Sequence, residues 1–118
     1  TETKKFENVR MSNRMKRYLP TLRRIQRLSE QSKRNLMRNC DKQLLDCFSE
    51  CSKNILKGNV PLNESQLRKL RREKKNLRAL ALKKTSLKAK SKILQNGVFI
   101  CALLGPAISI LGSLLFNR

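Results

Sequence analysis

The chain alternates between segments whose apolar residues recur every three or four positions and short polar breaks, a spacing typical of amphipathic helices. The first such segment follows Leu19-Pro20, and Thr21 is predicted to cap a helix that runs to about residue 38. Its predicted apolar face contains Leu22, Ile25, Leu28, Ser32 and Leu36. Because Arg and Lys occupy the remaining faces, the segment predicts a basic amphipathic helix.

A second helix is predicted to begin after Asp41 as its N-cap and to end before Gly58, since helix C-termini favour a left-handed glycine. Its apolar stripe contains Leu44, Phe48, Cys51 and Ile55, widened by Leu45, Cys47 and Leu56. Residues 41–66 hold three Lys against four acidic residues, a net charge of −1. A neutral, apolar segment between basic ones predicts the core helix.

A third helix is predicted after Asn63, with Gln66 in the capping-box position. Its stripe contains Leu67, Leu70, Leu77, Leu80 and Ala81. A short fourth helix is predicted to begin at Thr85 or Ser86. The predicted fold class is therefore all-α: a small helical hairpin or three-helix cluster built on residues 41–56, with basic amphipathic helices and a separate apolar C-terminal helix.

The last apolar segment, Val98 to Phe116, has nineteen residues without a charge. As a helix it is about 28 Å long, close to the thickness of a bilayer core. Residues predicted to support membrane contact or self-association are Ala102, Gly105, Pro106, Ser109 and Gly112, four of them small. Three interpretations stay open: membrane insertion or disruption, self-association or docking to capsid proteins, and packing as a buried core helix.

The sequence predicts three regions. Residues 1–20 form a basic, disordered N-terminal arm, in which Met11 or Met15 is the expected natural start. Residues 21–96 form a basic helical nucleic-acid-binding domain, and residues 97–118 form the apolar C-terminal tail.

The charge predicts a polyanionic partner. Twenty-eight Lys and Arg face eight Asp and Glu in 118 residues, a formal net charge of +20. Residues 68–92 hold twelve basic residues and one acid, net +11, and residues 14–38 hold nine and one, net +8. Because like charges four apart destabilise a helix, such blocks favour a polyanion as their partner. The predicted nucleic-acid contacts are Arg68, Lys69, Arg71, Arg72, Lys74, Lys75, Arg78, Lys83 and Lys84, with Arg23, Arg24 and Arg27.

Residues suited to catalysis are scarce, so we expect a protein that is not an enzyme and has no cofactor. There is no His, and the acidic residues are scattered singly. The four cysteines are interpreted as small buried hydrophobes in a reducing compartment, a zinc site or an intermolecular disulfide being the alternatives. With four Phe, one Tyr and no Trp, base stacking is not expected to carry recognition.

The stretch Cys47 to Leu62, which ends Leu-Lys-Gly-Asn-Val-Pro-Leu, is followed by a Leu/Lys/Arg block over 67–92 and a glycine-led apolar tail from Gly97. In this order the chain resembles the small basic virion core proteins of adintoviruses and related Polinton (Maverick) elements, which are compared with the adenoviral core protein X (mu). The resemblance implies a virion core component that condenses double-stranded DNA, present in the virion and, during assembly, in the host nucleus.

We therefore expect a nucleic-acid-binding and condensing protein that contacts the phosphate backbone of double-stranded DNA without reading its sequence. The alternative is a tail-anchored or membrane-active cationic protein that is associated with an anionic membrane. A third possibility is a helical adaptor or chromatin-type protein whose tail is part of its core. The choice between DNA and RNA and the oligomeric state are left open by the sequence.

Overall fold

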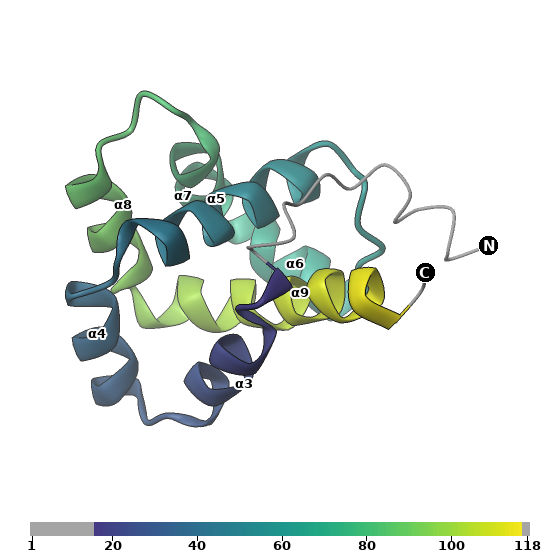
Figure 1. The fold of residues 1–118 in the computed structure, drawn as a ribbon. Helices are drawn as coiled ribbons and strands as arrows, with labels where there is room; N and C mark the ends of the chain where they lie inside the picture. The colour runs from purple at the N-terminus through teal and green to yellow at the C-terminus, as the bar shows by residue number, and fades with distance from the viewer. Residues whose placement is uncertain (1–15, 117–118) are drawn as a thin grey trace.

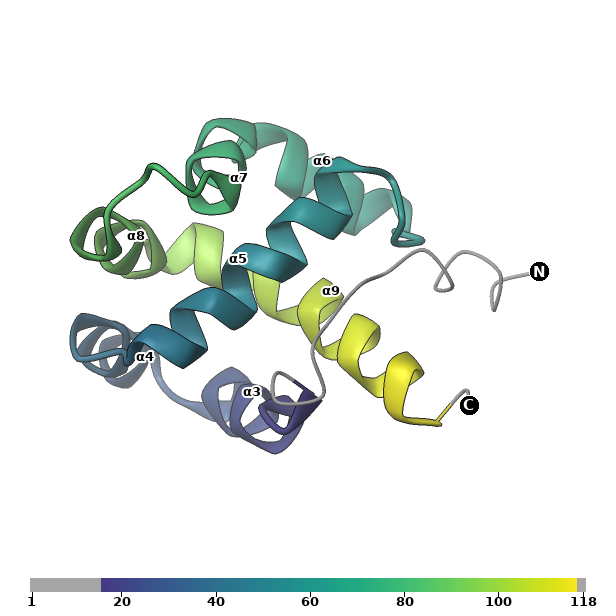
Figure 2. The ribbon, with the colours of Figure 1, turned by 45° about the horizontal axis from the view of Figure 1, so that its top comes forward.

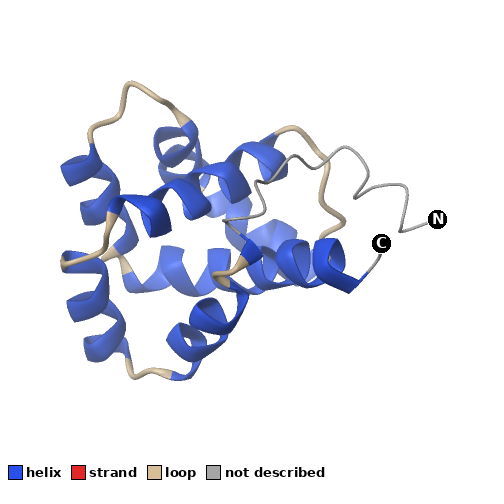
Figure 3. Ribbon diagram, in the orientation of Figure 1, coloured by secondary structure: helices blue, strands red, loops and turns tan. Residues whose placement is uncertain are grey.

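The computed structural model describes residues 16–116, with side chains up to residue 112, and every regular element within these bounds is an α-helix (Figure 1, Figure 3). The helices are α3 (Leu19–Arg27), α4 (Glu30–Arg38), α5 (Lys42–Leu56), α6 (Glu64–Arg72), α7 (Lys74–Ala81), α8 (Leu87–Leu94) and α9 (Gly97–Phe116). The predicted all-α class is confirmed. Most of the predicted arm, residues 1–15 with both candidate start methionines, lies outside the described residues, and its last two residues begin α3.

Helix α9 is the centre of the fold. It packs against α3, α4, α5, α6 and α8, and Figure 2 shows α5 crossing over it. The most buried side chains of α9 are Phe99, Ile100, Leu103, Leu104, Ala107, Ile110 and Leu111. The prediction of a separate C-terminal helix is therefore corrected, because this segment packs inside the core together with the other helices. A helix that is apolar on nearly all sides is most stable when other helices surround it, because its whole apolar surface is then removed from water.

The predicted core helix on residues 41–56 is confirmed as α5. Its N-cap is Asp41, whose Oδ1 accepts a hydrogen bond from the amide of Leu44 at 2.8 Å. Phe48 is completely buried, and Gly58 follows the helix with a φ of +75°, the left-handed conformation that favours glycine. Cys47 and Cys51 lie on α5, whereas Cys40 precedes its N-cap and is therefore outside the helix.

The first predicted helix is in fact two helices. The first of them, α3, begins at Leu19 and not after Thr21, and it ends at Arg27, because the backbone of the following Leu28 is extended. Ser29 then caps α4, because its Oγ accepts a hydrogen bond from the amide of Ser32 at 3.2 Å. This cap satisfies one of the free amides that a new helix start creates, so the break costs little.

The break between α3 and α4 changes which residues face the core. Leu22 and Ile25 are buried as predicted, but Leu36 is exposed. The buried positions of α4 are Lys33 and Met37. A single straight helix would have kept Leu36 on the same side as Ile25; the turn at Leu28–Ser29 removes that relationship.

The third predicted helix is also divided, at Glu73. The predicted capping box is present, since Asn63 and Gln66 each accept a hydrogen bond from the other's backbone amide, at 2.8 and 3.2 Å. Helix α6 packs on α9, whereas α7 packs on α5. Because the two halves of the predicted stripe serve different neighbours, Leu70 and the α7 leucines are buried but Leu67 stays exposed.

Helices α8 and α9 are also capped by side chains at their starts. Of the two candidates at the fourth helix it is Ser86 that caps α8, since its Oγ accepts from the amide of Ala89 at 3.1 Å. Asn96 does the same for α9, where its Oδ1 accepts from the amides of Val98 and Phe99 at 3.0 and 3.2 Å. Each cap satisfies amides that the helix itself cannot.

Candidate nucleic-acid interface

Helix α6 presents a dense group of cations to solvent. The capping box sets its start, and Leu70 is its buried residue. With Leu70 turned inward, the four basic residues that surround it in sequence are all exposed; they are Arg68, Lys69, Arg71 and Arg72. The basic amphipathic pattern predicted from the sequence therefore holds for this helix, with its cations on the outside.

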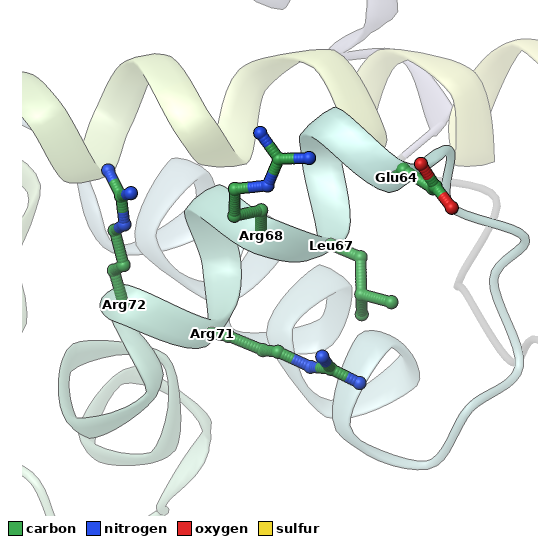
Figure 4. A pocket seen from close by; sticks show the side chains of 5 residues that line it. All are labelled: Glu64, Leu67, Arg68, Arg71 and Arg72. Carbon is green, nitrogen blue, oxygen red and sulfur yellow. The ribbon is translucent and has the colours of Figure 1, made fainter.

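The three arginines of this group line one hollow of about 400 Å³ together with Glu64 and Leu67 (Figure 4). Figure 4 shows Arg68 and Arg72 pointing to the same side of α6, toward α9, while Arg71 points away from them and runs below Leu67. Guanidinium groups are planar donors suited to phosphate oxygens. The hollow therefore offers donors on two sides of an exposed leucine.

A second hollow, of about 340 Å³, lies between α6 and the start of α9. Its cations are Lys69 and Arg72, and its apolar lining comes mainly from Val98 and Cys101, both exposed. Glu30, at the start of α4, also lines it. Arg72 belongs to both hollows, so the cations of α6 also border the uncharged first turn of α9.

The predicted cations beyond α6 extend this surface along the chain. Lys74, Lys75 and Arg78 lie on α7, and Lys83 and Lys84 lie in the loop that leads to α8; all five are exposed. We call the nine residues Arg68, Lys69, Arg71, Arg72, Lys74, Lys75, Arg78, Lys83 and Lys84 the α6–α7 surface.

The other predicted cations, Arg23, Arg24 and Arg27, are exposed on α3. Helices α3 and α6 both pack on α9, and they lie on different sides of it in Figure 1 and Figure 2. The structure thus places the α3 arginines apart from the α6–α7 surface, across the core helix.

Within the described part of the chain no cation of the α6–α7 surface forms an ion pair, although Glu64 and Glu30 each line one of its hollows. The two ion pairs among residues 16–112 are Lys42 with Asp46 at 3.1 Å and Lys53 with Glu50 at 3.3 Å, both on α5. The nine cations of this surface therefore outnumber the acidic side chains near them and repel one another, an arrangement that favours an external anion.

The charge counts of residues 14–38 and 68–92 include Lys33 and Lys90, but both of these lysines are buried. The Nζ of Lys33 donates to the Sγ of Cys101 at 3.5 Å, and the Nζ of Lys90 donates to the Oγ of Ser49 at 3.0 Å. The signal that could have identified them is spacing, because each precedes a buried apolar residue by four positions, Met37 and Leu94.

Burial lowers the pKa of the Lys90 ammonium from its usual 10.5. Asp46 and Glu50 favour the charged form, and Lys53 and Lys42 oppose it, but burial is the largest effect. Below pH 10.5 there is consequently an interval in which the unfolded chain binds the proton and the folded chain does not. Stability contributed by this group rises with pH across that interval.

We expect Lys90→Met to be at least as stable as the wild type at pH 7, because an apolar side chain of similar length avoids the cost of burying the ammonium. The advantage should shrink as the pH rises toward 10.5. Urea unfolding of both proteins between pH 7 and 10.5 measures the difference. Lys92→Met, an exposed position on the same helix, is the control and should show no such trend; a pH-independent difference for Lys90→Met would contradict the account.

The four cysteines differ in burial. Cys47 and Cys51 are buried, as predicted, whereas Cys40 is half-buried and Cys101 is exposed. Burial, with the Asp41 charge adding, raises the pKa of Cys40 to about 12. A hydrogen bond with Cys47 and burial raise the pKa of Cys51. Thiolates are the metal-binding form, and in the part of the chain that is described no group of three or more His, Cys, Asp or Glu could hold a metal ion.

The five residues predicted for membrane contact or self-association do not share one environment. Ala102 and Pro106 are buried, Gly105 and Gly112 are half-buried, and Ser109 is exposed. A Cβ on Gly105 would lie 3.4 Å from the Nε2 of Gln66, so part of this small-residue face is used within the chain, where α6 meets α9.

A search of the described residues for membrane spans finds no single helix that is long and apolar enough. One bent pair, Leu87–Leu94 with Gly97–Gly112, passes by length and composition, with an angle of 94° between the two helices.

Comparison with known proteins yields no match: no family model, no curated protein and no solved structure is similar to this chain.

Proposed function

We propose that the chain binds nucleic acid through its phosphates, without reading sequence, and condenses double-stranded DNA as a core component of a virion. The observation that carries the proposal is the α6–α7 surface, where nine cations are exposed and none is ion-paired within the described residues. Lysine and arginine on such a surface neutralise phosphates and release condensed counterions, which supplies affinity for any sequence.

The aromatic residues support backbone contact over base recognition. Phe48 and Phe99 are buried in the core, and Tyr18 is half-buried with its hydroxyl donating to Gln43 at 3.1 Å. Among described side chains there is accordingly no exposed aromatic platform on which a splayed base could stack. A rigid duplex with a regular array of phosphates suits such a surface better than single-stranded loops.

The burial of α9 bears on the membrane-associated alternative. A tail anchor must leave the rest of the protein to enter lipid, and here that would expose the core contacts of Phe99 and Leu103. We therefore do not propose a tail-anchored or membrane-active protein. The proposed setting is the virion and, during assembly, the host nucleus.

We expect wild-type affinity for duplex DNA to fall steeply with salt and to be the same for unrelated sequences. If half of the nine surface cations contact phosphate, the slope of log K against log salt is about −4, at roughly −0.9 per contact. Fluorescence anisotropy with two unrelated duplexes between 50 and 200 mM salt, about the range over which such effects are large, measures it. Anionic vesicles at the same salt are the comparison.

A slope near zero, or a strong preference for one duplex, would refute phosphate-based binding. Tighter binding to phosphatidylserine vesicles than to DNA would instead favour a membrane surface as the partner.

A further inference from the structure

A second group of cations lies at the other side of the fold, around a hollow of about 490 Å³ between the end of α4, the first turn of α5, and α8. The residues that line it are Arg38, Cys40, Lys42, Leu45, Leu87, Lys88, Ser91, Lys92 and Gln95. We call it the α4–α8 hollow. Four of its nine residues are basic and none is acidic.

The fold holds these cations in place through packing and one short hydrogen bond. The Oγ of Ser91 donates to the backbone oxygen of Met37 at 2.6 Å and so ties α8 to the last turn of α4. Leu45, which is 2 % exposed, forms an apolar floor. The hollow is thus part of the packed body of the protein.

Most of the charge in this hollow has no internal partner. Lys42 is paired with Asp46, but Arg38, Lys88 and Lys92 are exposed and form no ion pair within residues 16–112. Lys88 and Lys92 are four apart on one helix, the spacing at which like charges destabilise it. An anion in the hollow would remove that cost.

The hollow and the α6 part of the α6–α7 surface occupy different regions. Helix α6 lies against the middle of α9, next to Gly105, while α8 directly precedes α9 and lies beside α4. Figure 1 and Figure 2 both show α4 and α8 together at one end, with α6 on the far side of α5 and α7. A duplex bound along α6 therefore leaves the α4–α8 hollow uncompensated.

We propose that the α4–α8 hollow binds phosphates of a second DNA duplex, so that one molecule bridges two duplexes. The inference rests on the proposed function, which places the first duplex on the α6–α7 surface. In condensed DNA the polyanion nearest to a free cationic end is a neighbouring duplex. The α6 cations and the α4–α8 hollow lie at different parts of a body of 38 × 29 × 27 Å, and together they provide the link that condensation requires.

The test compares two double variants of the full chain that each remove two exposed positive charges. Lys88→Gln with Lys92→Gln alters the hollow; Arg34→Gln with Lys57→Gln is the control, since neither residue lines the hollow or belongs to the α6–α7 surface. Energy transfer between donor-labelled and acceptor-labelled duplexes reports bridging, and anisotropy of one dilute labelled duplex reports single-duplex affinity. Thermal unfolding verifies that both variants fold.

We expect the hollow variant to need at least about tenfold more protein than the control to bridge duplexes at 0.1 M salt, because each lost phosphate contact weakens binding on the order of tenfold there. Its single-duplex affinity should match that of the control. A wild type that binds no duplex would refute the proposed function itself. Binding without bridging would overturn the bridging role and the condensing part of the proposed function, and would leave phosphate binding standing. Unchanged bridging by the hollow variant, or an equal loss of single-duplex affinity, would overturn the bridging role of the hollow alone.

Discussion

Leu104→Asp is expected to unfold the domain. Leu104 lies at the centre of α9 and is 1 % exposed. The change removes roughly 2–3 kcal/mol of hydrophobic burial and places a carboxylate without a partner in the core, which costs several kcal/mol more. Small domains are stable by only about 5–15 kcal/mol, so the folded state should not survive. Circular dichroism and urea unfolding measure the loss.

Ser109→Asp is the matched control, because Ser109 is exposed on the same helix. It adds the same charge, and we expect a change in stability within about 0.5 kcal/mol. A chain ending at residue 96 should likewise lose its cooperative transition, since α3, α5 and α6 would lose the helix on which they pack. If that truncated chain kept its helicity, or if Leu104→Asp unfolded at the wild-type urea concentration, α9 would not be the core.

Replacing Arg68, Arg71, Arg72 and Lys75 by Gln is expected to weaken DNA binding most among changes to the surface. Each lost phosphate contact removes about 0.9 from the salt slope, so the slope should flatten by up to about four. At 0.1 M salt the affinity should fall by about three to four orders of magnitude if all four contact phosphate. Gln retains a high helix propensity, so the fold should be unaffected. Anisotropy titrations across salt concentrations measure both quantities.

A second quadruple variant separates position from charge. Changing Arg23, Arg24, Arg27 and Arg34 to Gln also removes four positive charges, but from α3 and α4, where the cations are less dense. We expect this variant to lose less affinity and less slope than the α6–α7 variant. Equal losses would mean that total charge matters and its location does not; an unchanged slope in the α6–α7 variant would mean that those side chains never reach phosphate.

Local interactions were the part of the fold most accessible from the sequence. Asp41, Asn63 and Ser86 cap helices where predicted, and Gly58 has the predicted left-handed conformation. These features depend on residues within a few positions, so the sequence contains everything needed to recognise them. The exposure of all twelve predicted phosphate contacts has the same origin, because Arg and Lys with no buried partner remain in water.

The breaks at Leu28 and Glu73 were not predictable from periodicity. On either side of each break the apolar spacing continues, so the sequence reads as one helix. The chain turns because α3 packs on α9 and α7 packs on α5, which requires different directions from the neighbouring α4 and α6. Leu36 and Leu67 were expected in the core for this reason, and both are exposed.

The sequence by itself determined that this protein is helical and strongly cationic and that α5 belongs to its core, because helix caps, apolar spacing and charge act locally. Only the tertiary structure decided that the uncharged segment from Gly97 onward lies in the core. An apolar helix can be buried either in lipid or among other helices, and its own sequence does not distinguish the two. Tertiary packing likewise turned Lys33 and Lys90 inward, because a buried position is set by the neighbouring helices and not by the side chain that occupies it.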